Sequence, residues 1–454
     1  MENPQAFLKE LRTLVQQNEV EQALARLSSF LEERSSDLLD EALSLTQQFN
    51  HWEQKMRLNL IDHKEYGVAF SNVCFGTLRL ITQSLKEMQG PAAQHPSAGV
   101  ALSDLGAAQS VAEASTEAPL LRSGRAKYEA GDYSGALADF DAAADQNPKL
   151  LEARLLQAML YGELGMPEEA LRFYNETLSL DPGHATALNN RGLIYLENIE
   201  NYQAARQDFD AALQAEPGMT TARFNRALTY MNLDEFEPAV RDLDACIKLK
   251  SQSEQAFGLR GICKARLHDY QSSLADLNIA LQYEPENATY ISTVGLNLYN
   301  QGDYASCIPE FDRSLTINPG QPETRNLRGI AHYFLENYAV ALGDFNQVIE
   351  VMPDNAYAWF FKGCCEKALG QTANAEASLK HAISIMPDMA EPYAILGVLY
   401  YEAENYDLAI TFCQSSLALD NEQSVALQYL ELAKTAKTKS GSGQSFLNLF
   451  GFKS

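Results

Sequence analysis

One sequence pattern recurs along about two thirds of the chain at a spacing of 34 residues. The same segment returns, with substitutions, as AGDYSGALADFDAAADQNP, ENYQAARQDFDAALQAEP, QGDYASCIPEFDRSLTINP and ENYAVALGDFNQVIEVMP. A fixed period of this length indicates a stack of supersecondary units, because one unit alone cannot bury its apolar face. Aligned on their closing prolines, the units number nine: 117–150, 151–184, 185–219, 220–253, 254–287, 288–321, 322–355, 356–389 and 390–423.

Small residues, large apolar residues and prolines recur at fixed positions of each unit. A Gly or Ala stands where two helices would cross: Gly124, Ala158, Gly192, Ala227, Gly261, Gly295, Gly329, Gly363 and Gly397. An aromatic residue or leucine in the second half faces it: Phe140, Tyr174, Phe209, Leu243, Leu277, Phe311, Phe345, Leu379 and Phe412. Seven units close on a proline: Pro148, Pro182, Pro217, Pro285, Pro319, Pro353 and Pro387. Small residues let two helix backbones approach, the large side chain fills the space beside them, and proline ends the second helix.

These residues resemble the tetratricopeptide repeat (TPR), a family of helical pairs. The resemblance implies an all-α fold, in which an N-terminal helical bundle precedes a right-handed TPR superhelix (α-solenoid) of about nine repeats. We assign 117–423 to the repeats, 424–437 to a C-terminal capping helix and 438–454 to a flexible tail. The segment 424–437 is more polar than a repeat, as a helix that covers the last open face should be.

Four units share an arginine and an aspartate that the general pattern does not require. Arg191, Arg226, Arg260 and Arg328 precede the crossing residue, and Asp208, Asp242, Asp276 and Asp344 precede the large residue in the same four units. We interpret each couple as a bidentate ion pair that ties the two helices of one unit together. A row of ligand-binding arginines is the alternative interpretation.

The resemblance implies that the first helix of each unit lines a concave groove in which a partner binds. We expect the groove to be formed by the fifth, ninth and twelfth residues of the units: Phe224, Leu228, Met231, Ile262, Leu296, Tyr299, Asn326, Ile330, Tyr333, Phe360, Val398 and Tyr401. This mostly apolar row predicts a protein or peptide partner with apolar anchors. The alternative interpretation places part of the row in the core between helices. Lys367 is almost the only cation among these positions, which disfavours a clamp for the C-terminal carboxylate of chaperones.

Residues 1–88 do not follow the period and predict four helices, at 4–17, 20–33, 37–58 and 63–88. Their second half resembles the bacterial effector-associated domains through Trp52, Glu53, Arg57, Glu65, Tyr66 and Asn72, although Val73 replaces the basic residue that often follows the asparagine. That family comprises small helical adaptors of conflict and signalling systems, which recruit an effector bearing a matching copy. The alternative is a helical cap on the repeats. Residues 89–116, rich in Ala, Ser, Gly and Pro, predict a flexible linker.

The tail carries five large apolar residues within seven positions: Phe446, Leu447, Leu449, Phe450 and Phe452. Three interpretations remain open, namely a disordered end, a segment that docks in its own or a neighbour's groove with self-association, and a weak membrane contact.

Charge and composition limit the partners. The formal net charge is −25, of which residues 120–433 carry −22, residues 1–88 carry −4, residues 89–119 carry −3 and residues 434–454 carry +4. An acidic array argues against nucleic acid and favours partners with basic flanks. No segment is apolar enough for stable membrane insertion, and seven scattered cysteines without metal-ligand spacing predict reduced thiols in a cytoplasmic protein.

Residues with a chemical role are not evident in this sequence. It contains no phosphate-binding loop, HExxH or GxSxG motif, and Cys364 and Cys365 fit packing positions better than nucleophiles. We therefore expect no catalytic residues, cofactor or metal, and not an enzyme. The sequence predicts an adaptor or regulator of a bacterial defence or signalling system, which recruits or restrains an effector such as a protease or nuclease. The alternative is a general TPR scaffold or chaperone-like protein whose N-terminal helices form a cap.

Overall fold

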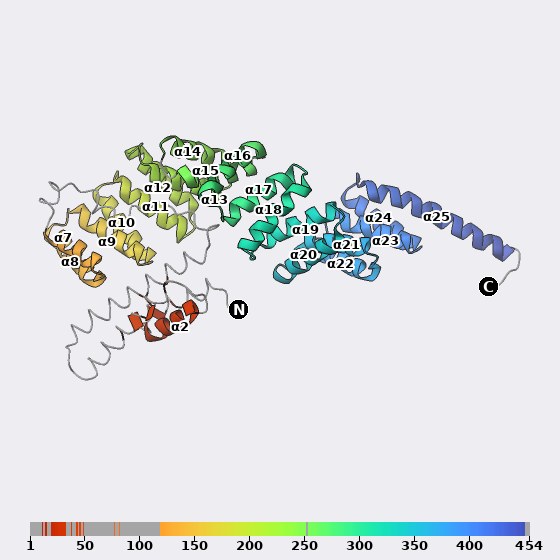
Figure 1. Cartoon of the computed structure of the whole chain (residues 1–454), viewed down its shortest axis with the longest axis horizontal. Helices are drawn as coiled ribbons and strands as arrows, with labels where there is room; N and C mark the ends of the chain where they lie inside the picture. Colours follow the sequence, from red (N-terminus) through yellow and green to blue (C-terminus); the bar gives the residue numbers. More distant parts are fainter. Residues whose placement is uncertain are drawn as a thin grey trace. The chain divides into compact units, whose positions relative to one another are not determined.

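The computed structural model describes residues 119–250 and 253–449, helix α2 (Val20–Glu32) and single positions between residues 11 and 81 (Figure 1). The side chains of residue 253 and residues 440–449 lie outside this description. All regular structure in the described part is helical, as predicted. The chain divides into two compact units, residues 1–268 and 269–454.

The first unit contains the helix pairs of four predicted repeats and the first helix of a fifth. They are α7 (Pro119–Glu129), α8 (Tyr133–Gln146), α9 (Leu151–Glu163), α10 (Pro167–Leu180), α11 (Ala185–Glu197), α12 (Tyr202–Ala215), α13 (Thr220–Asn232), α14 (Phe236–Lys248) and α15 (Ser253–Arg266). One continuous hydrophobic core runs from Leu121 to Cys263 through these helices. Each repeat therefore buries its apolar face against its neighbours.

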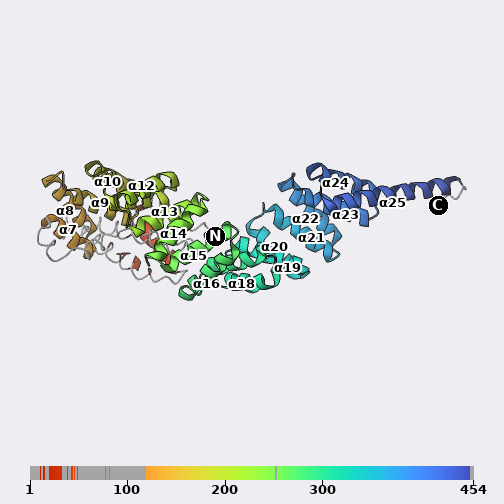
Figure 2. The same ribbon diagram turned by 90° about the horizontal axis from the view of Figure 1, so that it is seen from above.

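The second unit continues the same alternation. Its helices are α16 (Tyr270–Tyr283), α17 (Ala288–Asn300), α18 (Tyr304–Ile317), α19 (Pro322–Phe334), α20 (Tyr338–Val351), α21 (Ala356–Ala368), α22 (Thr372–Ile385), α23 (Ala390–Glu402), α24 (Tyr406–Leu419) and α25 (Ser424–Leu449). Figure 2 shows the two helices of a repeat side by side, as in α21 with α22 and α23 with α24. The first helix of each pair carries the predicted groove residues.

Side-chain caps and left-handed turns set where the second helices begin. Asp303 accepts a hydrogen bond from the backbone N–H of Ser306 and so caps α18, and Asn405 caps α24 through the N–H of Leu408. The turn before the cap needs a residue with positive φ, which Gly302 supplies at φ 79°. Where no glycine stands there, a non-glycine residue takes up the conformation, as Glu404 does at φ 58°.

The crossing glycines make the close contacts that the sequence predicts. A Cβ built on Gly295 would lie 2.6 Å from Cε1 of Phe311, and one on Gly192 would lie 2.8 Å from Cε1 of Phe209. The expectation for the last repeat is wrong, because Cys413 rather than Phe412 faces the crossing residue Gly397. Cys413 is four residues after Ala409, just as Phe311 is four residues after Cys307 in the sixth repeat. Cys413 and Phe311 therefore occupy the same position of their second helices.

The C-terminal helix is longer than expected, because α25 continues to Leu449 rather than ending at residue 437. Glycine and serine lower helix propensity in the segment TKSGSGQ, but each glycine costs only about 1 kcal/mol and no proline interrupts the helix. Ala426, Leu430 and Ala433 are buried, and they pack this helix on the last repeat. The role of residues 424–437 as a cap stays a prediction, which this packing supports.

In the N-terminal region, the helix predicted at 20–33 is confirmed as α2. Leu24, Leu27 and Leu31 of α2 are buried in a cluster that also holds Leu11 and Ala42. The remaining parts of the helices expected at 4–17, 37–58 and 63–88 lie outside the described residues. So do the linker 89–116 and the positions on which the effector-associated resemblance depends, from Trp52 to Asn72.

Candidate partner-binding surface

Bidentate ion pairs hold the first helices, which carry the predicted groove residues, against the second helices. Arg226 donates from Nε to Oδ2 of Asp242 at 2.8 Å and from Nη2 to Oδ1 at 2.7 Å. The pairs Arg191 with Asp208 and Arg328 with Asp344 have the same geometry, so three of the four predicted pairs are confirmed. In the fourth pair, Arg260 and Asp276 lie in different compact units of the chain, residues 1–268 and 269–454. This pair stays a prediction.

Each of these arginines also binds the preceding repeat, which was not expected. Nη1 of Arg226 donates to Oδ1 of Asp210 at 2.7 Å, and Nη1 of Arg328 donates to Oδ1 of Asp312 at 2.6 Å. Arg191 and Arg260 use Asn175 and Asp244 in the same way. One feature of the sequence could have predicted these bonds between repeats. A polar residue directly follows the large apolar residue, as in Asp-Phe-Asp at 208–210. The hydrogen bonds that these arginines donate to the aspartates raise the pKa of Arg191, Arg226 and Arg328 above the ordinary arginine value.

In the first unit, the predicted groove residues are divided between the core and the surface. Phe224 and Leu228 are buried in the core, with 0% and 5% of their surface exposed. A partner would not contact these two side chains without repacking the repeat. Met231 and Ile262 are half-buried. All four remain predictions as partner contacts.

In the second unit, Ile330 and Val398 are buried, and Phe360 packs against the core of the last two repeats. The other predicted residues are half-buried: Leu296, Tyr299, Asn326, Tyr333 and Tyr401. The alternative interpretation of the row, as core between helices, therefore describes part of it. These positions likewise stay predictions as a binding site.

Tyr299 and Tyr333 belong to a group of rings that we call the aromatic surface: Tyr299, Tyr304, Tyr333 and Phe334. The three tyrosines are half-buried and Phe334 is exposed. Tyr304 stacks on Phe334 with ring centroids 4.7 Å apart, and Tyr299 meets Tyr304 edge-on at 5.5 Å. Phe334 also meets Tyr333 edge-on at 5.6 Å, yet it remains 49% exposed. Rigid rings on a solvated surface are the usual anchors of protein interfaces.

Two members of the aromatic surface, Tyr304 and Phe334, were not predicted from the sequence. Phe334 follows the twelfth residue of its repeat, Tyr333, and Tyr304 opens a second helix, whereas only three positions of each first helix were considered. Acidic residues lie next to both in sequence, since Asp303 precedes Tyr304 and Glu336 follows Phe334 by two positions. Both acidic residues are exposed. The surface thus combines apolar rings with neighbouring negative charge.

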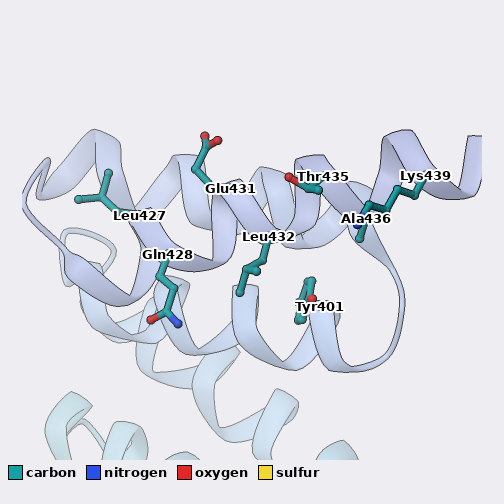
Figure 3. A pocket seen from close by; sticks show the side chains of 8 residues that line it. All are labelled: Tyr401, Leu427, Gln428, Glu431, Leu432, Thr435, Ala436 and Lys439. Carbon is teal, nitrogen blue, oxygen red and sulfur yellow. The ribbon is translucent and has the colours of Figure 1, made fainter.

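A second feature is a hollow at the end of the array, which we call the end hollow. Figure 3 shows the residues that line it: Tyr401, Leu427, Gln428, Glu431, Leu432, Thr435, Ala436 and Lys439. Its volume is about 510 Å³. Tyr401 forms its floor and meets Tyr429 of α25 edge-on with centroids 5.4 Å apart. Leu427 and Leu432 are 47% and 40% exposed.

The described residues include two adjacent cysteines, Cys364 and Cys365, but no cluster of metal ligands. Within the described residues, no group of three or more His, Cys, Asp or Glu side chains could hold a metal ion. Cys364 and Cys365 are buried, and burial raises the pKa of each to about 12. Both thiols are therefore protonated at neutral pH and are poor nucleophiles. None of the described helices is long and apolar enough to cross a bilayer.

Comparison with protein families separates the two regions of the chain. A tetratricopeptide-repeat model matches residues 121–185, 155–220 and 326–390, and a second one matches 220–253. Residues 6–84 match effector-associated domain 11. No curated protein matches the chain.

Several solved structures are similar to the repeats. YrrB, described as a TPR protein with an unusual peptide-binding site, is 22% identical, with 41% of this chain and 95% of that chain covered and a TM-score of 0.38. The C-terminal part of a TPR protein from Cytophaga hutchinsonii is 16% identical, with coverages of 53% and 98% and a TM-score of 0.42. MamA from Desulfovibrio magneticus is 18% identical, with coverages of 38% and 97% and a TM-score of 0.36.

Proposed function

The chain is a tetratricopeptide-repeat protein with an N-terminal effector-associated domain, and on this basis we propose that it acts as an adaptor or regulator in a bacterial defence or signalling system. The repeats are a protein-interaction scaffold of a kind that is generally non-enzymatic, and the N-terminal domain suggests association with an effector. In our proposal the repeats bind one protein or peptide, while the N-terminal domain recruits or restrains a protease or nuclease through a matching domain. We place the protein in the cytoplasm, where its cysteines stay reduced.

The aromatic surface supports the first half of this proposal. Phe334 is half-exposed although it is among the largest apolar side chains, and stacking on Tyr304 holds its ring in place. An ordered ring loses little conformational entropy on binding, which favours its use as an anchor. Exposed Asp303 and Glu336 would attract basic residues beside the anchor. We therefore expect a partner segment with large apolar residues and basic flanks.

The observation that carries the second half is that effector-associated domain 11 and the repeats occur in one chain. Two binding regions on one chain would bring their partners together at a high effective concentration. The proposal therefore requires two partners that depend on different regions. A general scaffold, in which residues 1–88 only cover the repeats, requires none that depends on the N-terminal region.

The test compares three versions of the tagged full-length protein in its natural host. They are the unchanged chain, a chain lacking residues 1–88, and the double variant Tyr299→Ser with Phe334→Ser. We expect the deletion to lose an effector that carries a matching domain, while the double variant keeps it and loses a different partner. The proposal fails if no partner depends on residues 1–88, an outcome that would favour the general scaffold. Assaying the purified effector with and without the chain then decides between activation and restraint.

A further inference from the structure

We propose that two copies of this chain associate through their C-terminal ends, with the apolar segment 446–452 of each copy covering the end hollow of the other. The inference goes beyond the adaptor function and does not depend on it. It starts from α25, whose one face is buried on the last repeat while another apolar face has no cover in the described part of the chain. The occupant that we assign to this face is a second copy.

The end hollow has the chemistry of a site for an apolar helix. Leu427 and Leu432 are on α25, close to half exposed, and Tyr401 lies beneath Leu432 (Figure 3). Small or uncharged residues, Thr435 and Ala436, continue the lining along the helix, and they allow another backbone to approach closely. Covering this surface would remove Leu432 and a tyrosine edge from water.

The segment 446–452 complements the hollow. It contains Phe446, Leu447, Leu449, Phe450 and Phe452, and no acidic residue occurs from residue 434 onward. The same stretch contains four lysines, whereas the array from 120 to 433 carries a formal charge of −22. Glu431 lines the hollow with its side chain 74% exposed and forms an ion pair with Lys434 of the same helix at 2.9 Å. The complementarity at the hollow is therefore mainly apolar, while the lysines of the segment favour approach to an array of net negative charge.

Helix geometry excludes the segment of the same chain as the occupant. Figure 1 shows α25 continuing beyond α24 as one helix, and it is unbroken from Ser424 to Leu449. At about 1.5 Å per residue, Leu449 stands roughly 26 Å along the axis from Leu432. Phe452 is three residues beyond Leu449 and reaches at most about 10 Å further, even in an extended chain. The apolar segment thus cannot return to its own hollow, and a neighbouring copy must supply it.

The register of α25 favours a reciprocal pair of helices. Positions 432, 436, 439, 443 and 446 follow one another at spacings of four and three residues and so share one face of the helix. Two such helices in antiparallel orientation place 446 of each copy beside 432 of the other, with Ala436 and Gly443 between. Lys439 of both copies then lies at the two-fold axis, where the long side chains can extend their ammonium groups into water. Both hollows are then covered in one closed two-fold interface, which does not grow into a filament.

Sedimentation velocity of the full-length protein tests this association. We expect the unchanged chain to sediment at twice its mass of 50.3 kDa and to dissociate on dilution. Both Leu432→Glu and the double variant Phe446→Ser with Phe450→Ser should weaken the dimer at least tenfold. The matched control is Leu419→Ser, because Leu419 is 45% exposed at the end of α24 but does not line the hollow. Its dimer should be unchanged, and circular dichroism should show equal helix content in all variants.

Mixing the two variants provides the decisive test of reciprocal docking. Leu432→Glu retains an intact segment and the double variant retains an intact hollow, so an equimolar mixture should recover part of the dimer that neither forms alone. The proposal is overturned if the unchanged chain is monomeric, or if its dimer survives both variants. It is also overturned if the mixture remains monomeric. A monomer whose segment binds anionic lipid vesicles would instead assign residues 446–452 to a membrane contact.

Discussion

Arg226 joins two consecutive repeats through a single guanidinium group. It binds Asp242, sixteen residues later, through Nε and Nη2, and Asp210, sixteen residues earlier, through Nη1. Asp242 is nearly buried, with 7% of its side chain exposed, whereas the Asp210 side chain is 49% exposed. The bond within the repeat is therefore shielded from water, and the bond between repeats is open to it.

We predict that Arg226→Ala lowers the free energy of unfolding by about 2–3 kcal/mol, because it leaves the Asp242 carboxylate buried without its bidentate partner. Urea unfolding followed by circular dichroism measures the change. Arg241→Ala is the control, since Arg241 is exposed on the neighbouring helix and should cost less than about 0.5 kcal/mol. Equal effects of the two substitutions would contradict the role of the pair.

The double charge reversal Arg226→Asp with Asp242→Arg should recover only part of the stability lost by Arg226→Asp alone. It restores an ion pair within the repeat but places a new carboxylate beside Asp210. Adding Asp210→Asn should recover a further fraction, about 0.5–1 kcal/mol, by removing that repulsion. A thermal unfolding series of the single, double and triple variants would show this order. A triple variant less stable than the double variant would refute the bridging geometry.

The same substitution should have opposite effects at two glycines. Gly295→Ala should destabilise by about 1–3 kcal/mol, since the added Cβ would lie 2.6 Å from the Phe311 ring. Gly343→Ala, in the middle of α20 with no atom within 4 Å of the new Cβ, should stabilise by about 0.4–1 kcal/mol through helix propensity. Urea midpoints measure both changes. Adding Phe311→Leu to Gly295→Ala should restore part of the loss.

The buried cysteines should resist alkylation in the folded protein. Burial raises the pKa of Cys246 and Cys307 to about 11 and of Cys263, Cys364 and Cys365 to about 12. At pH 8 these thiols are protonated, and alkylating reagents need the thiolate. Peptide mass spectrometry after iodoacetamide treatment should find these five residues unmodified in buffer and modified in urea. Rapid native labelling of Cys364 would show that it is less buried than its packing indicates.

The aromatic surface can be tested in a protein that remains folded. Phe334→Ser should lower the free energy of unfolding by about 1–2 kcal/mol, because half of the ring is buried against Tyr304 and Tyr333, and the protein should remain folded. The substitution should weaken binding of the repeat-dependent partner at least tenfold, or about 1.4 kcal/mol. Val351→Ser is the matched control, since Val351 is 69% exposed at the far end of α20. Calorimetric titration with the partner gives both affinities. Loss of binding in both variants would place the site elsewhere.

The repeating fold was predictable because its determinants are local and periodic. Three features recur every 34 residues: a crossing glycine, a large residue opposite it and a closing proline. The pattern therefore remains recognisable where a single repeat departs from it. The bidentate pairs were also predictable, since arginine and aspartate occur in the same units. The bond from Arg226 to Asp210 was not predictable, because it joins two consecutive repeats. The occurrence of arginine and aspartate in the same repeat contains no information about a bond between repeats.

Sequence by itself thus determined the all-helical array, the approach of paired helices and the chemistry of the ion pairs, all of which depend on residues within one period. Tertiary structure alone decided which apolar residues remain in contact with solvent. Phe224 and Phe334 are both phenylalanines on first helices, yet one is fully buried and the other is half-exposed. Exposure depends on how neighbouring helices cover each position, and that coverage is set by packing between repeats rather than by residue type.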